Sequence, residues 1–294
     1  MKESVEATMK ETIKEPLKAT MQETIKKLMI AKVINYLQCP LTGSELNVKG
    51  NYLENRRGDK YFIDNGIIDL IGDIGKKIED SSEKKVKDSY REISEEKYNR
   101  WVKSKFIMRL VWGVNLDKIP KIKDEASRFS QGVILDIPCG TGIMSMEAYK
   151  ALPDSIFLAI DYSRSMLYAT KCLCERQGID NVVFIRADVS SLPIKDNTVS
   201  ACISLNGFHA FAFPQMAAQE LGRCIRNEGK LLMVASCKGE RFISDFMIKH
   251  FMIPKGYFHN ALPGSKYAEY LQQAGFSKVS YEMMGASMIA RCCK

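Results

Sequence analysis

The residues best suited to chemistry form a turn at positions 136–142, which reads Asp-Ile-Pro-Cys-Gly-Thr-Gly. The turn follows a short apolar run and precedes a segment with a helical pattern. Gly140 and Gly142 let the backbone approach a ligand closely and adopt positive φ. The N-terminus of a following helix offers free N–H groups and partial positive charge, which suit a phosphate or a carboxylate. The turn therefore predicts a small-ligand site in which Asp136 can hold an ammonium group.

Two further acids extend this site. Asp161 ends the next apolar run, 25 residues after Asp136, and its carboxylate can accept hydrogen bonds from both ribose hydroxyls. Asp188 follows the third run, where it can accept from an adenine amino group beside the backbone of Val189. Each aspartate alone could be a loop or cap residue. Three carboxyl groups at the ends of successive strands indicate a ligand site, because ligands of parallel sheets bind at those ends.

Short apolar runs alternate with helical segments from residue 131 onward. The runs predict strands at 133–135, 156–160, 182–185, 199–204 and 230–235. Helices are predicted at 143–152, 163–177 and 214–225, followed by one at 267–274 and two last strands at 278–281 and 286–291. This alternation predicts an α/β fold with a mostly parallel sheet covered by helices on both faces. A dinucleotide fold is less consistent with the turn, since Ser145 stands where Gly-x-Gly-x-x-Gly has its last glycine.

With these residues in view, positions 131–291 resemble the class I S-adenosylmethionine (SAM)-dependent methyltransferases, specifically the ubiquinone/menaquinone-biosynthesis-like group. The matching stretches include Val133-Ile-Leu-Asp-Ile-Pro-Cys-Gly-Thr-Gly142, Ala159-Ile-Asp-Tyr-Ser-Arg-Ser-Met-Leu167 and Ala187-Asp-Val-Ser-Ser-Leu-Pro193. The resemblance implies a Rossmann-like seven-stranded sheet with an antiparallel last strand. It also implies SAM as the cofactor and S-adenosyl-L-homocysteine as its product. No metal is expected, because no pair of the nine cysteines has the C-x-x-C spacing of a zinc ribbon. The cofactor-binding residues implied are Asp136, Pro138, Cys139, Gly140, Thr141, Gly142, Asp161, Tyr162, Met166, Asp188, Val189 and Asn206.

The chain departs from the family pattern at three places. Pro138 replaces the first glycine of the usual Gly-x-Gly-x-Gly, at a position that does not need positive φ. Ser200 stands where an aspartate often precedes the fourth strand, and Asn227-Glu228-Gly229 replaces the usual Pro-Gly-Gly turn. None of these changes removes an expected contact with the cofactor.

The loop at 204–213 is expected beside the transferred methyl group. His209 is the candidate catalytic residue, because an unperturbed imidazole titrates near neutrality. Phe208 and Phe211 predict an apolar or aromatic wall of the acceptor pocket, although both also fit a core. The loop lacks the Asn/Asp-Pro-Pro-Tyr/Phe signature of enzymes that methylate amide or base amino nitrogens. A lid is expected from an insert at about 238–263 and from a helical segment at 76–130, with Tyr90 and Tyr98 over the ligand.

The N-terminal 75 residues carry two additions. Residues 1–30 predict an amphipathic helical arm with an internal repeat, since Ala7-Thr-Met-Lys-Glu-Thr-Ile-Lys14 returns twelve residues later. The arm is a candidate contact for homo-oligomerisation. Residues 31–75 predict a small β-rich module that resembles the zinc-ribbon-like domain found with some methyltransferases. Only Cys39 remains of its metal-binding cysteines, and Thr42 stands at a second ligand position, so no bound zinc is expected.

Composition sets the outer limits. The 294 residues are 46% hydrophobic and 27% charged, which is ordinary for a soluble globular protein. Nine scattered cysteines argue against a disulfide framework. No apolar run approaches a membrane span and no signal-like segment opens the chain, so a cytoplasmic location is the default expectation. The net charge of +8 is concentrated in 76–128, which leaves nucleic acid as a less favoured partner.

Three functional hypotheses follow. The favoured one is a SAM-dependent methyltransferase that acts on oxygen, carbon or nitrogen of a small, largely apolar or aromatic metabolite. An RNA methyltransferase is the second, prompted by the N-terminal module and the positive charge. A SAM-binding scaffold or activator without catalysis is the third.

Overall fold

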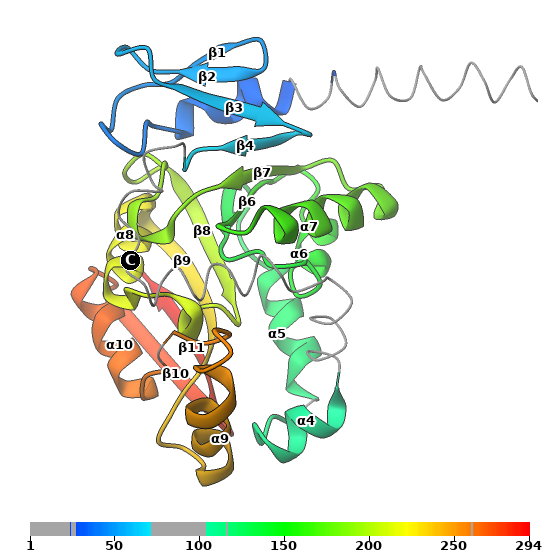
Figure 1. The fold of residues 1–294 in the computed structure, drawn as a ribbon, viewed down its shortest axis with the longest axis vertical. Coiled ribbons are helices and arrows are strands. Elements are labelled where there is room, and N and C mark those ends of the chain that lie inside the picture. The colour runs from blue at the N-terminus through cyan, green and yellow to red at the C-terminus, as the bar shows by residue number, and fades with distance from the viewer. Residues whose placement is uncertain (1–23, 25–27, 72–103, 116, 260) are drawn as a thin grey trace, which may run out of the picture.

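The computed structural model describes residue 24 and residues 28–71, 104–115, 117–259 and 261–294. Its centre is an eleven-stranded sheet in the order β1-β2-β3-β4-β7-β6-β5-β8-β9-β11-β10 (Figure 1). The strands are β1 (Asn47–Lys49), β2 (Tyr52–Glu54), β3 (Lys60–Asp64), β4 (Ile67–Asp69), β5 (Val133–Asp136), β6 (Ile156–Asp161), β7 (Val182–Arg186), β8 (Val199–Leu205), β9 (Ile225–Ser236), β10 (Lys278–Met284) and β11 (Ser287–Cys293).

The seven strands β5 to β11 include the predicted apolar runs, but β9 begins at Ile225, five residues before the predicted run and through the expected turn at 227–229. Strands β7, β6, β5, β8 and β9 are parallel, and β11 then pairs antiparallel with both β9 and β10. Every residue of β5 and β8 is buried, which is typical of parallel strands with helices on both faces. The implied antiparallel last strand is therefore confirmed by the pairing of β11.

The N-terminal module changes the strand count. The family resemblance implied a seven-stranded sheet, and the turn pattern predicted a small β-rich module; β4 pairs in parallel with β7, so the module strands and the seven strands form one sheet. In Figure 1 the module strands continue the sheet beyond β7. Without β4, the backbone N–H and C=O groups along one side of β7 would form an open edge. The correction arises because apolar patterning identifies strands and not their neighbours.

The helices that cover the sheet are α5 (Lys118–Ala126), α6 (Met146–Ala151), α7 (Arg164–Gln177), α8 (Pro214–Cys224) and α10 (Gly264–Gln273). Local sequence sets their ends. Ser163 caps α7 through a hydrogen bond from the Met166 N–H, and Gly178 ends it at φ 67°. Pro214 occupies the first turn of α8, where its fixed φ suits a helix start.

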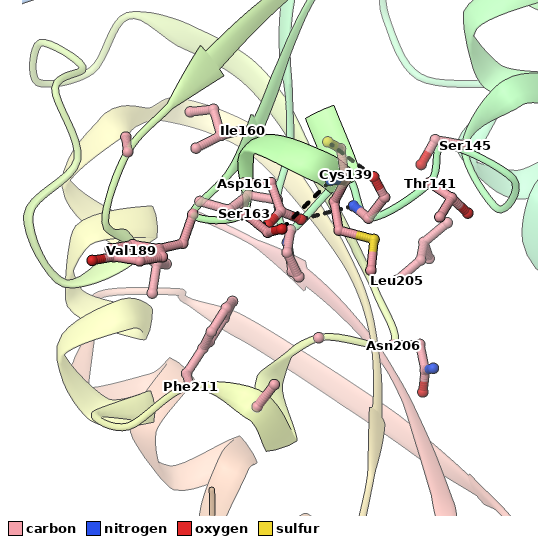
Figure 2. A pocket seen from close by; sticks show the side chains of 18 of the residues that line it. Cys139, Thr141, Ser145, Ile160, Asp161, Ser163, Val189, Leu205, Asn206 and Phe211 are labelled. Atoms are coloured by element: carbon pink, nitrogen blue, oxygen red, sulfur yellow. Dashed lines mark hydrogen bonds between the residues drawn. The ribbon is translucent and has the colours of Figure 1, made fainter. Parts of the chain in front are cut away.

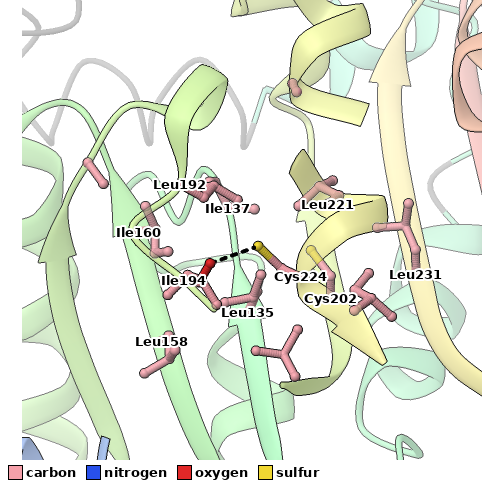
Figure 3. Close-up of a cluster of buried hydrophobic side chains, with 14 of the residues drawn as sticks. Leu135, Ile137, Leu158, Ile160, Leu192, Ile194, Cys202, Leu221, Cys224 and Leu231 are labelled. Atoms are coloured by element: carbon pink, nitrogen blue, oxygen red, sulfur yellow. Dashed lines mark hydrogen bonds between the residues drawn. The ribbon is translucent and has the colours of Figure 1, made fainter. Parts of the chain in front are cut away.

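The core consists of two apolar clusters. Figure 3 shows the cluster beneath α8, where Leu221 and Cys224 face Leu135 of β5 and Cys202 of β8. The Cys224 thiol donates to the carbonyl of Ile194 at 3.7 Å. The second cluster includes Tyr149, whose ring lies 4.7 Å from that of Phe157. Packing on two faces holds the strand ends in fixed positions.

The structure describes only part of the expected lid and of the expected N-terminal arm. Residues 72–103, with Tyr90 and Tyr98, and nearly all of the arm lie outside the described residues, although 28–33 are helical and lead into η1 (Ile34–Tyr36). From the lid segment, the structure describes α4 (Lys105–Leu110) and α5. No helix among the described residues is long and apolar enough to cross a membrane.

The insert at 238–263 contains α9 (Phe242–Met247) and the π-helical turn η5 (Ile248–Met252). Ser244, Ile248 and Met252 are buried, whereas the side chains of Phe242, Phe246 and Phe251 are exposed. The insert is anchored by Phe258, whose ring stacks on Trp112 at 5.7 Å. Most of its aromatic side chains therefore face outward.

The contact between α8 and α10 supplies a stability test. A Cβ built on Gly222 would lie 2.1 Å from the carbonyl oxygen of Ala274. We expect Gly222→Ala to lower the unfolding free energy by about 1–3 kcal/mol through overpacking, although alanine has the higher helix propensity. Urea denaturation measures the change. Gln219→Ala, on the exposed face of the same helix, is the control and should not destabilise; a stabilised Gly222→Ala variant would contradict the contact.

Candidate functional site

A cavity opens at the C-terminal ends of β5, β6, β7 and β8 (Figure 2). Together with its solvent-open mouth, it contains about 1070 Å³ of space free of protein atoms. Four loops line it, with residues from 137–145, 160–166, 187–190 and 205–212. Because all four loops follow parallel strands, they converge at one edge of the sheet.

The turn after β5 is shaped by a close helix contact. The Gly142 N–H donates to the Cys139 carbonyl at 3.0 Å, and the Thr170 hydroxyl of α7 donates to the Gly140 carbonyl at 2.7 Å. Gly142 has φ 74°, and a Cβ there would lie 2.7 Å from the Thr170 methyl. The position therefore requires glycine for both backbone conformation and space. Pro138, Cys139, Gly140 and Thr141 line the cavity.

Asp161 joins two of the loops. Its Oδ2 accepts a hydrogen bond from the Gly140 N–H at 2.9 Å, and its Oδ1 accepts from the Ser163 N–H at 2.8 Å. The side chain also lines the cavity, and Figure 2 shows it between Cys139 and Val189. Burial raises the pKa of this carboxyl to about 6 against the opposing effect of the backbone N–H donors. The carboxylate can still accept further hydrogen bonds from a ligand.

Asp136 lies beneath the cavity and does not line it. The carboxyl is fully buried, and its Oδ2 accepts a hydrogen bond from the Tyr149 hydroxyl. Burial, reinforced by the charge of Asp161, raises the pKa of Asp136 to about 7, although the hydrogen bond from Tyr149 and the nearby Ser145 hydroxyl oppose the shift. The Oδ1 atom has no partner among the described residues. Ser145, which lines the cavity, follows the same turn as Asp136.

The remaining expected cofactor contacts gather in the same cavity. Its lining includes Tyr162, Met166, Asp188, Val189 and Asn206. Asp188 caps the short helix η3 (Val189–Ser191) by accepting from the Ser190 N–H at 2.8 Å. Asn206 adopts φ 67° at the end of β8, a conformation that asparagine tolerates better than most residues.

His209 does not face the cavity, and this changes its expected role. The imidazole is buried, its Nδ1 accepts from the Ser236 N–H at 3.4 Å, and its ring lies 3.9 Å from that of Phe258. Burial lowers the pKa of His209 to about 3. The short helix η4 (Phe208–Ala210) turns this side chain toward the core. In this conformation His209 supports the loop and is not placed to remove a proton from an acceptor.

The two phenylalanines of this loop divide between core and cavity. Phe208 is fully buried and packs against Tyr267, with ring centroids 6.0 Å apart. It is a core residue and does not line the cavity, contrary to the pocket-wall expectation. Phe211 does line the cavity, and its ring lies 5.1 Å from that of Phe208. The loop is irregular, so the spacing of apolar residues in the sequence could not show which of the two phenylalanines is buried and which lines the cavity.

Comparison with known proteins matches this region. Residues 134–229 match the protein family described as a methyltransferase domain. An uncharacterised chloroplastic methyltransferase of Arabidopsis thaliana is 30% identical over 102 residues, or 33% of this chain and 29% of the relative. The ubiquinone/menaquinone biosynthesis C-methyltransferase of Blochmanniella pennsylvanica is 30% identical over 105 residues, or 35% and 41%. A SAM-dependent methyltransferase structure from Aquifex aeolicus has a TM-score of 0.51 at 18% identity, covering 66% of this chain and 95% of that chain.

Residues 134–229 thus carry the sequence pattern of a methyltransferase domain, and the structure from Aquifex aeolicus shares the fold around them. The matched residues run from β5 into β9 and include Asp136, Asp161 and Asp188. The match spans less than half of the length of the two curated relatives named above. Among the described residues, no group of three or more His, Cys, Asp or Glu side chains has an arrangement that could hold a metal ion.

Several cavity residues escaped the sequence reasoning. Ser145 lines the cavity, and the Tyr149 hydroxyl donates to the Asp136 carboxyl. Ser145 and Tyr149 are four residues apart at the start of α6, and this spacing in the sequence indicates that they share one helical face. Leu205, Ala210 and Ala212 also line the cavity, but small and apolar side chains carry no chemical signature that marks them in a sequence.

The raised pKa values predict an unusual pH dependence of stability. With folded-state pKa values of about 7 for Asp136 and about 6 for Asp161, the folded protein binds more protons than the unfolded chain, whose carboxyls titrate near pH 4. The contribution of these groups to stability is therefore lost as the pH rises through about 4–7. We expect Asp136→Asn to reduce the stability loss between pH 5 and pH 8 by roughly 1–4 kcal/mol.

Chemical denaturation at the two pH values measures this difference. Asp180→Asn is the matched control, because Asp180 is exposed and its replacement should leave the pH dependence as in the wild type. An Asp136→Asn protein with the wild-type pH dependence would show that this carboxyl is not protonated in the folded state.

Proposed function

We propose that this protein transfers a methyl group from SAM to a small, largely apolar or aromatic metabolite. The observation that carries the proposal is the charge of the cavity. Asp161 lines it and Asp136 lies beneath it, and neither carboxylate has a basic ion-pair partner among the described residues. SAM carries an ammonium and a sulfonium cation, so it supplies the positive charge that these buried acids lack.

We propose a position in the cavity for each part of SAM. The turn at 138–142 would hold the methionine end, with Asp136 as the counter-charge. Asp161 would accept the ribose hydroxyls, since each of its oxygens retains acceptor capacity beyond its backbone N–H donor. Met166, Asp188 and Val189 would surround the adenine, an assignment supported by their place in the same cavity lining.

Bound SAM supplies an electrophilic methyl group, and the protein's task is to align the acceptor and exclude water. Leu205, Ala210, Phe211 and Ala212 form an apolar side of the cavity near the loop after β8. An apolar wall favours an apolar or aromatic acceptor. His209 is turned away, so we propose an acceptor that ionises readily itself, such as a phenol or an activated carbon acid. The relative described as a C-methyltransferase fits this class.

Replacement of Asp161 tests the cofactor site. Asp161→Ala removes the expected ribose contacts and the link to Gly140. We expect SAM affinity to fall on the order of 100-fold, because hydrogen bonds to a charged group contribute about 1.5–3 kcal/mol each. Isothermal titration calorimetry measures the dissociation constant, and circular dichroism shows whether the variant is folded. Asp180→Ala is the exposed control; equal affinities for wild type and a folded Asp161→Ala would refute the assignment.

The acceptor class is tested by label transfer. The protein is incubated with methyl-labelled SAM and either a metabolite extract or total RNA. We expect label in small organic-soluble products, and a reduced initial rate for Phe211→Ala at SAM concentrations that saturate both proteins. Label in RNA would overturn the metabolite proposal, and measured SAM binding without label in either fraction would favour a non-catalytic scaffold.

A further inference from the structure

One carboxylate of the N-terminal module reaches two arginines of the methyltransferase domain. The Oδ2 of Asp69, the last residue of β4, accepts from Arg186 Nη1 at 3.0 Å and from Arg164 Nη2 at 2.7 Å. The backbone fixes this geometry, because Asp69 is paired with Arg186 in the β4–β7 register and the Leu70 N–H donates to the Arg186 carbonyl at 2.9 Å. Asp69 is therefore a node between the module, β7 and the start of α7.

Arg186 also contacts Tyr162, a residue that lines the cavity. Its Nε donates to the Tyr162 carbonyl at 2.9 Å, and its guanidinium lies 5.3 Å from the centre of the Tyr162 ring. Tyr162 lines the cavity between Asp161 and Ser163. Arg164 follows segment 161–163 in the sequence, and Arg186 contacts the segment at Tyr162. Both arginines bind the carboxylate of Asp69 in the N-terminal module.

Burial makes the Asp69–Arg186 pair stronger than an ordinary surface ion pair. The two side chains are only 15% and 14% exposed, so salt and water screen their attraction less than on an open surface. Although desolvation opposes it, the charge of Arg186 helps to lower the pKa of Asp69 below its usual range. The neighbouring Asp64–Arg164 pair is 55% and 45% exposed, and pairs of that kind contribute little.

We propose that Asp69 is a positioning residue for the cofactor site, through which the N-terminal module sets the affinity for SAM by holding Arg186 against Tyr162. The inference rests on the proposed binding of SAM in this cavity. Loss of the carboxylate leaves two neighbouring guanidinium groups without their shared counter-charge, so Arg186 moves away from Arg164 and releases the Tyr162 carbonyl. The loop that carries Asp161 then loses part of its preorganisation.

The test compares Asp69→Asn with Asp64→Asn in the full chain. Both variants remove one carboxylate charge that contacts Arg164, but only Asp69 also contacts Arg186. We expect Asp69→Asn to raise the calorimetric dissociation constant for SAM about tenfold, and Asp64→Asn to change it less than about twofold. Thermal unfolding of both variants without SAM is measured in parallel. Lowered thermal stability of Asp69→Asn with wild-type affinity would overturn the proposal, because the contact would then be structural only.

A double-mutant cycle identifies the route of the effect. If Asp69 acts through Arg186, Asp69→Asn and Arg186→Lys weaken SAM binding less together than the sum of their separate effects. Additive losses would overturn the route through Arg186. Should Asp69→Asn not fold, Arg186→Lys alone decides, since lysine keeps the charge and loses the planar fork; unchanged affinity would then refute the proposal. A wild-type protein that does not bind SAM would instead refute the proposed function.

Discussion

The carboxylate of Asp161 is the contact on which the site depends most directly. It ties the turn after β5 to the turn after β6 through two backbone N–H donors while its side chain lines the cavity. A buried carboxylate is costly unless hydrogen bonds or a cation compensate it. The protein supplies the hydrogen bonds and no basic side chain among the described residues, so the turns are fixed and the charge remains available. This explains how one residue can shape the site and prepare it for a cationic ligand.

The same logic accounts for the contrast between the acids and the histidine. Burial favours the neutral form of all three groups, but Asp136 and Asp161 lie at or beneath the cavity, where their charge bears on a ligand once they ionise, whereas His209 is buried against Phe258. A site of this kind is better suited to aligning a methyl acceptor with the cofactor than to removing a proton from that acceptor. That arrangement suits methyl transfer from a sulfonium, in which the leaving group is already activated and the nucleophile needs an aligned approach more than a strong base.

The N-terminal module extends the sheet and is more than an appendage. Strand β4 covers the edge of β7, and Asp69 adds a buried ion pair to that backbone pairing. Within the module, the Cys39 sulfur lies 3.1 Å from the Tyr61 hydroxyl and accepts a hydrogen bond from Asn55 Nδ2 at 3.3 Å. A module fixed by its own contacts and by β7 can transmit a constraint to the cavity.

The sequence by itself determined the succession along the chain of the seven strands from residue 133 onward and of α6, α7, α8 and α10, and it predicted that the acidic strand ends converge. These properties follow from local patterns: apolar runs, helix caps and the glycine turn at 136–142. Only the tertiary structure decided that β4 pairs with β7, that Asp136 lies beneath the cavity, and that His209 and Phe208 point into the core. Strand partners and the direction of loop side chains depend on contacts between distant segments, such as His209 with Phe258. Those contacts have no period along the chain, so they emerge only when the chain is folded.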